Sequence, residues 1–243
     1  MDTSNIGGHI SSAYDSELAT LAGYVFEMGD IVVEQIRDAV QALKTGDREL
    51  ADKVVGSDHR LDALEVRADE ECARIIARRQ PAAGDLRFIL AMSKAVTDLE
   101  RMGDEAERIG HMAMRLAEVG EPRGDGQRRF GELGHLGDGV QRMVRAALDA
   151  LRDHDMASAA AVVRDDLEVD HEYEAVVRQV MTYMMEDPRA IPRVLNLMWA
   201  ARSLERIGDR ARNICEYVIY LVRGRDVRHT SLEHLEREAR RPD

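Results

Sequence analysis

Two short segments of the chain repeat one acidic pattern. One reads LERMGD and contains Glu100 and Asp104, and the other reads LERIGD and contains Glu205 and Asp209. Residues four apart share one face of a helix, and glycine inside a helix costs about 1 kcal/mol relative to alanine. Each segment nevertheless places a glycine directly before its Asp. The repeat predicts a duplicated site in which paired carboxylates act together.

A second set of acidic pairs stands opposite the first in the expected hairpins. In an antiparallel hairpin, residues equally far from the turn lie at one level, and the midpoints here fall at Pro81 and between Asp187 and Pro188. The sequence therefore predicts four facing carboxylates in each half. The predicted metal ligands are Glu100, Asp104, Asp58 and Asp62 in the first half and Glu205, Asp209, Asp166 and Asp170 in the second.

Such clusters would oppose folding unless a cation is bound. Two carboxylates about 6 Å apart repel by roughly 3 kcal/mol at an effective dielectric constant near 20. Sets of oxygen ligands suit magnesium, calcium, manganese or iron, and the near absence of histidine argues against a catalytic zinc site. We expect bound metal ions.

One alternative to metal binding stays open for these acidic faces. The carboxylates could exchange salt bridges with neighbouring arginines, namely Arg101, Arg108, Arg206 and Arg210. Arg108 stands where the second repeat has Asn213, and an ion pair with Asp104 could replace a ligand there. The second site is therefore the better metal candidate, with Asn213 and His111 as further ligands. The repeated glycines fit close helix packing as well as access to a site.

Motifs of familiar enzymes are absent from the sequence. Glu132 and His135 form an ExxH pattern, but a carboxylate di-iron centre needs two such motifs. No nucleophile elbow, P-loop or dinucleotide motif occurs. We expect a protein that is not an enzyme. A carboxylate-bridged metalloprotein and a metal-free helical scaffold are the alternatives to a metal-dependent regulator.

Composition favours a helical protein. Of 243 residues, 44% are hydrophobic and only 4% aromatic, which favours an all-α fold. The net charge of −12 argues against binding to nucleic acid or to an anionic membrane except through partners. Cys72 and Cys215 form no disulfide or zinc motif, and no signal or membrane-spanning segment is apparent. A cytoplasmic location is expected.

Apolar residues recur at three- and four-residue steps in six stretches, which predicts six long helices. They cover about residues 18–43, 47–76, 85–116, 136–151, 155–186 and 194–221. The fourth repeats the pattern of the first at an offset of 108 residues. We expect two tandem three-helix bundles related by an internal pseudo-two-fold, in domains 1–120 and 127–224, joined by a glycine-rich linker and followed by a charged tail, 225–243.

At this level of detail the chain resembles the PhoU family, the accessory proteins of the bacterial phosphate-specific transport system. The resemblance covers nearly the whole chain. It rests on both acidic helices and on several short segments: His9-Ile10-Ser11, Tyr14-Asp15-Ser16-Glu17-Leu18, Arg78-Arg79-Gln80-Pro81, Asp85-Leu86-Arg87 and the stretch from Glu205 to Ile214. Two residues depart from the family pattern: Arg108 replaces an Asn, and Tyr173 stands where the first repeat has Glu65.

The resemblance implies a function as well as a fold. It implies a cytoplasmic regulator that damps the phosphate-specific ABC transporter and the phosphate-sensing histidine kinase when phosphate is plentiful. The transporter's ATPase subunit and that kinase would be its partners, and a homodimer is expected. The acidic motifs would hold iron, zinc, manganese or magnesium. Bound cations could neutralise acidic patches and so gate contacts with partners.

Overall fold

A computed structural model describes residues 12–119, 131–228 and 230–240. All regular elements in these ranges are helices, which confirms the all-α prediction. The predicted linker, from Gly120 to Gly126, lies outside the described residues, and so does the family-like segment from His9 to Ser11.

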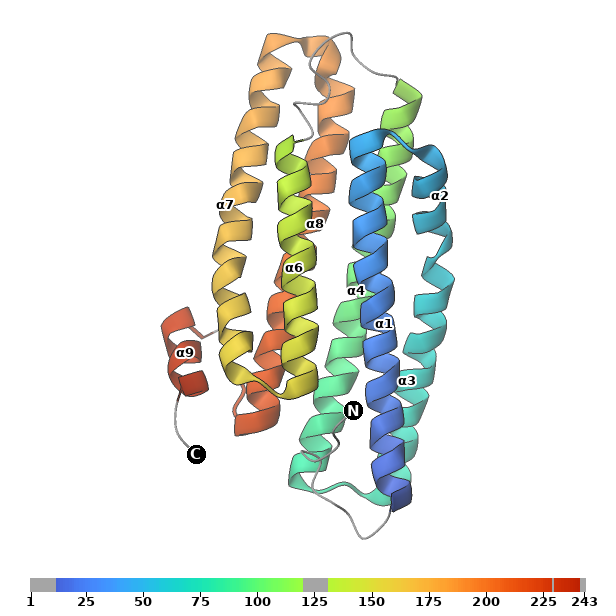
Figure 1. Ribbon diagram of the computed structural model, residues 1–243, viewed down its shortest axis with the longest axis vertical. Coiled ribbons are helices and arrows are strands. Elements are labelled where there is room, and N and C mark those ends of the chain that lie inside the picture. The colour runs from blue at the N-terminus through green and yellow to red at the C-terminus, as the bar shows by residue number, and fades with distance from the viewer. Residues whose placement is uncertain (1–11, 120–130, 229, 241–243) are drawn as a thin grey trace.

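The first half of the chain forms a bundle around α1 and α4. Its helices are α1 (Ser12–Thr45), α2 (Arg48–Gly56), α3 (Asp58–Arg79) and α4 (Ala83–Val119). In Figure 1, α1 and α3 stand side by side at one edge of the molecule, with α4 behind α1. Buried apolar side chains from α1, α3 and α4, among them Leu18, Leu61 and Met102, fill the space between these helices.

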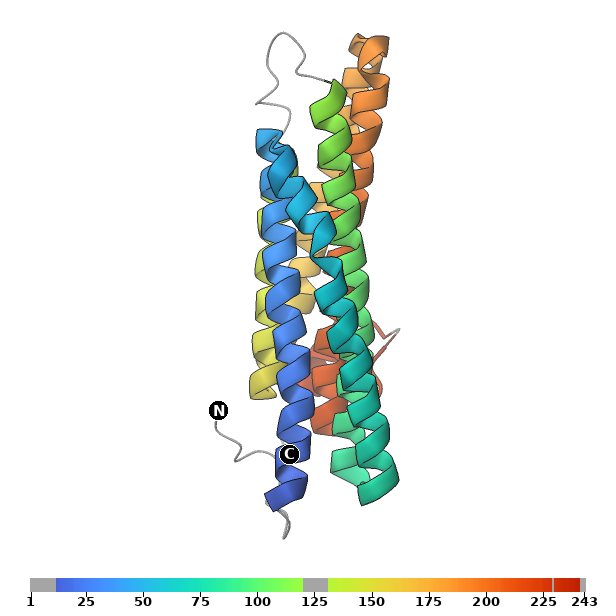
Figure 2. The same ribbon diagram turned by 90° about the vertical axis from the view of Figure 1, so that its right-hand side faces the viewer.

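The second half repeats this plan. It consists of α6 (Gly131–Asp153), α7 (Met156–Glu186), the short 3₁₀ helix η1 (Pro188–Ala190) and α8 (Ile191–Arg223). In Figure 1, α7 forms the opposite edge of the molecule from α3. The two bundles join mainly through α4 and α8, which run in opposite directions, while α1 also contacts α6. Figure 2 shows this elongated molecule from the side, where α3 and α4 cross at a small angle.

Matching aspartate caps begin the second helix of each repeat, α2 in the first and α7 in the second. Asp47 accepts a hydrogen bond from the backbone N–H of Leu50, and Asp155 accepts from those of Ala157 and Ser158. An aspartate at this position satisfies backbone donors that the helix itself leaves unpaired. The caps lie 108 residues apart, the same offset as the apolar pattern, so this offset aligns the first two long helices of the sequence prediction in each repeat, whereas Glu100 and Glu205 on the third helices lie 105 residues apart.

The prediction of one continuous helix over residues 47–76 is wrong at Ser57, where α2 ends and α3 begins. The Ser57 hydroxyl donates to the carbonyl of Val54 at 2.7 Å and accepts from Nε2 of Gln35 on α1 at 3.0 Å. These two bonds hold the break. As a result Asp58 lies in the first turn of α3, where the helix dipole favours a negative charge.

The segment beyond Gly224 contains one short helix, α9 (Leu232–Arg240), which packs against α7. An ion pair between Arg164 and Glu236 joins the two helices. Both cysteines are buried and free, as their isolation in the sequence predicts. Within the described ranges, no helix combines the length and the apolar character needed to cross a bilayer.

Candidate metal centre

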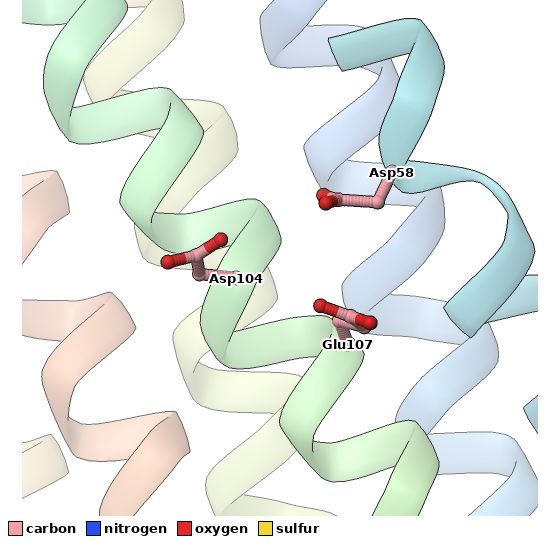
Figure 3. Close-up of side chains that lie close together, drawn as sticks. All are labelled: Asp58, Asp104 and Glu107. Atoms are coloured by element: carbon pink, nitrogen blue, oxygen red, sulfur yellow. The ribbon is translucent and has the colours of Figure 1, made fainter. Parts of the chain in front are cut away.

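Three carboxylates from two helices of the first bundle meet in one place. Asp58 comes from the first turn of α3, and Asp104 and Glu107 come from successive turns of α4. One oxygen atom of each lies within 4.8 Å of the others, and all three side chains are half-buried. Figure 3 shows Asp58 reaching across from α3 toward the two acids of α4. These three residues are called the first cluster below.

The electrostatics of the first cluster are those of crowded like charges. Burial, followed by the charges of Asp62, Glu107 and Asp104, raises the pKa of Asp58 from 3.8 to about 6. The pKa of Glu100 is raised as well, by burial first and then by Asp104 and Glu65. Within the described part of the chain, no lysine or arginine is bonded to Asp58, Asp104 or Glu107. The cluster thus presents uncompensated negative charge.

The equivalent carboxylates of the second bundle also gather. Burial and then the charge of Asp170 raise the pKa of Asp166, on α7, to about 6. Asp209, on α8, has its pKa raised by burial and then by Asp170. Glu205 follows the same direction, through burial and then Asp209. Acids of α7 and α8 thus lie near one another in the second hairpin, as Asp58 and Asp104 do in the first. Asp166, Asp170, Glu205 and Asp209 are called the second cluster.

Arginines compensate part of the charge of the second cluster. Nη1 of Arg212 lies 3.3 Å from Asp166, and Nη1 of Arg202 lies 2.7 Å from Glu205. The guanidinium of Arg202 also lies 5.8 Å from the ring centre of Tyr173, the residue that replaces Glu65 in this repeat. The second cluster has thus lost one acid and gained two guanidinium partners. A cation would have to compete with them.

The two repeated glycines differ in how closely the facing helix packs on them. A Cβ on Gly103 would collide with Cδ2 of Leu61. The space above Gly208 is looser, with Cγ1 of Val169 as the nearest atom at 3.4 Å. In both repeats the opposing Asp also lies over the glycine. Close packing therefore explains Gly103 but not Gly208, and access to a metal site stays a prediction for both.

The structure places the other candidate residues away from the predicted ligand role. Asn213 donates to Asp98 at 3.3 Å, across the interface between the bundles. Arg108 pairs with Glu105 at 2.7 Å instead of Asp104. His111 lies 3.4 Å from Glu107, so it stands at the edge of the first cluster. Arg108 therefore does not pair with Asp104 in the first cluster, and Asn213 is bonded to Asp98 on the other bundle.

Arg206 and Arg210 do not bond the clusters either. Arg206 pairs with Glu105 at 3.0 Å and Arg210 with Asp98 at 3.2 Å, both at the contact between α4 and α8. Sequence reasoning missed the place of Glu107 in the first cluster. The sequence does contain the relevant pattern, because Glu100, Asp104, Glu107 and His111 follow one another at helical steps of three or four residues and so share one helix face.

The donor set of the first cluster fits a hard metal ion. Carboxylate oxygens from Asp58, Asp104 and Glu107 are ligands that magnesium, manganese and iron accept. A buried oxygen without a hydrogen-bond partner lies by each cluster: Oε1 of Gln35, close to Gly103 in the first bundle, and Oε2 of Glu205 in the second cluster. A cation, or water bound to it, would satisfy such oxygens.

Comparison with known proteins identifies the family. The pattern of the PhoU domain matches residues 25–113 and again residues 133–218. This chain belongs to the PhoU family. The two matched segments correspond to the two bundles, which confirms the internal repeat and the tandem arrangement. Membership in a family of accessory proteins also confirms that the chain is not an enzyme.

Relatives match along nearly the whole length. The phosphate-specific transport system accessory protein PhoU homolog of Pseudomonas aeruginosa is 51% identical over 231 residues, covering 95% of this chain and 93% of the relative. The PhoU protein of Escherichia coli is 42% identical over 238 residues, covering 98% and 96%.

Solved PhoU structures share the fold. The crystal structure of PhoU from Pseudomonas aeruginosa aligns with a TM-score of 0.82 at 51% identity, covering 87% of this chain and 100% of that one. The phosphate transport system regulatory protein PhoU from Streptococcus pneumoniae aligns with a TM-score of 0.79 at 28% identity, covering 88% and 99%.

Proposed function

We propose that this protein is a cytoplasmic regulator of phosphate uptake and signalling. When phosphate is plentiful, it damps the phosphate-specific ABC transporter and keeps the phosphate-sensing histidine kinase from activating its target genes. Its partners are the ATPase subunit of the transporter and that kinase, and it acts as a homodimer. The full-length likeness to named accessory proteins of the phosphate-specific transport system carries this proposal.

The first cluster is the proposed metal site. Asp58, Asp104 and Glu107 would supply the ligands, with Glu100 and Asp62 adding negative charge close by. Oxygen donors favour magnesium, manganese or iron over zinc. A bound cation supplies positive charge that compensates the repulsion within the cluster. The second cluster would hold its cation more weakly, since Arg202 and Arg212 already bond two of its acids.

Metal binding would regulate docking by changing the charge on one flank of the bundle. Helices α3 and α4 present the first cluster on a long helical face, which suits a broad docking surface. Compensating negative charge on such a face changes which partner surfaces it can bind. Partner binding would thereby depend on the concentration of that cation in the cytoplasm.

One experiment tests the metal and the partners together. Tagged protein is purified from phosphate-rich cells without chelator, its metal content is measured, and co-purified proteins are identified by mass spectrometry. We expect metal in the preparation, together with the transporter ATPase and the kinase. The variant with Asp104→Asn and Glu107→Gln should lose most of the metal and the partners while keeping its helical circular dichroism.

The matched control is Glu174→Gln, a change in an exposed carboxylate on α7. It should retain both metal and partners. Retention of partners by the cluster variant after its metal is lost would contradict the proposed regulation and favour a metal-free scaffold. Light scattering coupled to gel filtration checks the homodimer, which predicts twice the mass of the 27.3 kDa chain.

A further inference from the structure

The end of the hairpin between α7 and α8 exposes an apolar surface. In Figure 1 this end extends beyond the ends of α1, α4 and α6. Met181 and Met185 on α7 are 52% and 78% exposed, and Trp199 on α8 is 55% exposed. Ile191 and Leu195, also exposed, precede Trp199 at steps of four residues and so share one face of α8 with it. These five residues are called the apolar end below.

The first repeat lacks most of this surface at its own hairpin end. Where α7 has Met181 and Met185, the offset of 108 residues gives the exposed alanines Ala73 and Ala77 on α3. Where α8 has a tryptophan, the offset of 105 residues gives Lys94 on α4. The hairpin of the first repeat therefore folds without large apolar side chains at these positions. Because the two methionines and the tryptophan are exposed, packing within one chain does not explain them.

The composition of this end is that of a protein interface. Segments 175–185 and 188–204 together contain four arginines and no Asp, Glu or Lys. Interfaces between proteins are enriched in Trp, Met and Arg and depleted in Lys, Glu and Asp. Trp and Arg are also frequent among the few residues that dominate binding. An exposed apolar patch with a polar rim is typical of a contact surface, and the apolar end fits this pattern.

The distribution of charge favours a second copy of the chain as the partner. The net charge is −12, so two copies repel each other on average. Over residues 174–205, however, four arginines balance four acids, so this end can approach a second copy without net repulsion. Glu186 and Arg189, at the turn, are both exposed. The rim thus has both signs of charge, which two copies related by a two-fold axis can pair.

We propose that two copies of the chain bind each other through the apolar end, in a closed dimer with two-fold symmetry. Met185 and Leu195 of each copy pack against the other copy, and Trp199 becomes buried. A head-to-tail contact is disfavoured, because the opposite end of the chain lacks three of the five residues and one apolar end would stay open. The inference rests on the homodimer of the proposed function and assigns its surface. It is independent of the proposed metal site.

Light scattering coupled to gel filtration, over a range of protein concentrations, tests the assignment. The parent protein should be a dimer. Met185→Glu combined with Leu195→Glu should weaken dimerisation at least a hundredfold and give the mass of the 27.3 kDa chain. The matched control, Ala77→Glu with Leu90→Glu, makes the same charge change at the equivalent positions of the first repeat and should dimerise as the parent does. All four positions are exposed, so neither variant loses core packing.

The fluorescence of Trp199, the only tryptophan in the sequence, gives a second readout. Its emission should shift to longer wavelength when the parent dimer dissociates on dilution, and the Met185→Glu, Leu195→Glu variant should show the shifted emission at every concentration. A parent protein that is monomeric at every concentration would contradict the homodimer itself.

Three other results would leave the homodimer in place and overturn only the assigned surface. These are a variant that stays dimeric, a control that becomes monomeric as the variant does, and open-ended assemblies in place of a dimer. If the variant stayed dimeric but no longer co-purified with the transporter ATPase, the apolar end would bind that partner instead of a second copy.

Discussion

The carboxylate of Asp58 lies against the bare backbone of Gly103, with its Oδ1 atom 3.7 Å from the position that a Cβ would occupy. The same distance separates Oδ1 of Asp166 from the Cβ position of Gly208. Each repeat therefore brings one acid of a cluster over one glycine of a facing helix. The apolar neighbours of the two glycines differ, however, so the same substitution at both positions gives a matched comparison.

Alanine should act in opposite directions at the two glycines. At Gly103 the new methyl group collides with Leu61, which is fully buried. Repacking a tight core costs about 1 to 3 kcal/mol, more than the gain of about 1 kcal/mol in helix propensity. At Gly208 all neighbours lie at 3.4 Å or more. Urea unfolding should show that Gly103→Ala destabilises the protein and that Gly208→Ala stabilises it by up to about 1 kcal/mol. Equal effects of the two changes would contradict this account.

Acid should stabilise the metal-free protein through Asp58. Its pKa is about 6 in the folded protein and 3.8 in the unfolded chain, so between these values the folded state binds more protons. The free energy of unfolding then falls as pH rises through this window and has lost its full contribution above about pH 6. Solvent screens a half-buried group, so we expect about 1 kcal/mol between pH 5 and pH 7. Urea unfolding with chelator present measures it.

The variant Asp58→Asn isolates this contribution. Asp166, whose pKa is also raised to about 6, acts in the same direction as Asp58, and His154, whose pKa burial lowers, acts in the opposite direction, but both effects are common to the two proteins. The difference in stability between the parent and Asp58→Asn should therefore shrink as the pH falls. A difference that does not change with pH would refute the role of Asp58. Saturating manganese should also remove the pH dependence if the first cluster holds the ion.

Simple helical geometry predicts much of the fold and of the candidate site from the sequence. The symmetry of the first hairpin about Pro81 correctly placed Asp58 opposite Asp104, because both helices continue without interruption between those residues and the turn. In the second half the same rule predicts Asp166 opposite Asp209, whereas the charge that raises the pKa of Asp209 most is that of Asp170. The repeated apolar pattern also predicted the tandem arrangement, which the two matches to the PhoU domain confirm. The domain boundaries at 120, 127 and 224 stay predictions.

The sequence alone does not predict which residues of distant helices contact each other. The break at Ser57 depends on a bond from Gln35, on another helix. Arg108 pairs with Glu105 and not with Asp104, and Asn213 bonds Asp98. Both contacts depend on how the two bundles pack against each other. Periodicity fixes which face a residue occupies, but several acids share a face with each arginine. Only the packing of α4 on α8 decides among them.

Two buried hydrogen bonds at the α4 and α8 interface should contribute equally to stability. Tyr217 donates to Oδ2 of Asp98 and Ser203 donates to Oε2 of Glu105, both at 2.7 Å. Each acceptor is a buried carboxylate, and the arginines bond its other oxygen. Tyr217→Phe and Ser203→Ala should each cost about 2 kcal/mol. The acceptors lie two turns apart on α4, so the double variant should show additive losses in urea unfolding. A change below about 0.5 kcal/mol in either variant would contradict a buried, charge-assisted bond.

The two clusters should differ in their affinity for cations, with the first the tighter. A cation at the second cluster must displace Arg202 from Glu205 and Arg212 from Asp166, whereas the first cluster offers acids without such partners. Titration of the metal-free protein with manganese, followed by electron paramagnetic resonance, should resolve two affinities at least tenfold apart, or about 1.4 kcal/mol. Asp104→Asn should abolish the tighter and Asp209→Asn the weaker. Arg202→Gln should tighten the weaker site, because it removes a competing charge and frees Glu205. If Asp209→Asn instead removed the tighter site, bonding to arginine would not control affinity, and the second repeat would be the principal metal centre.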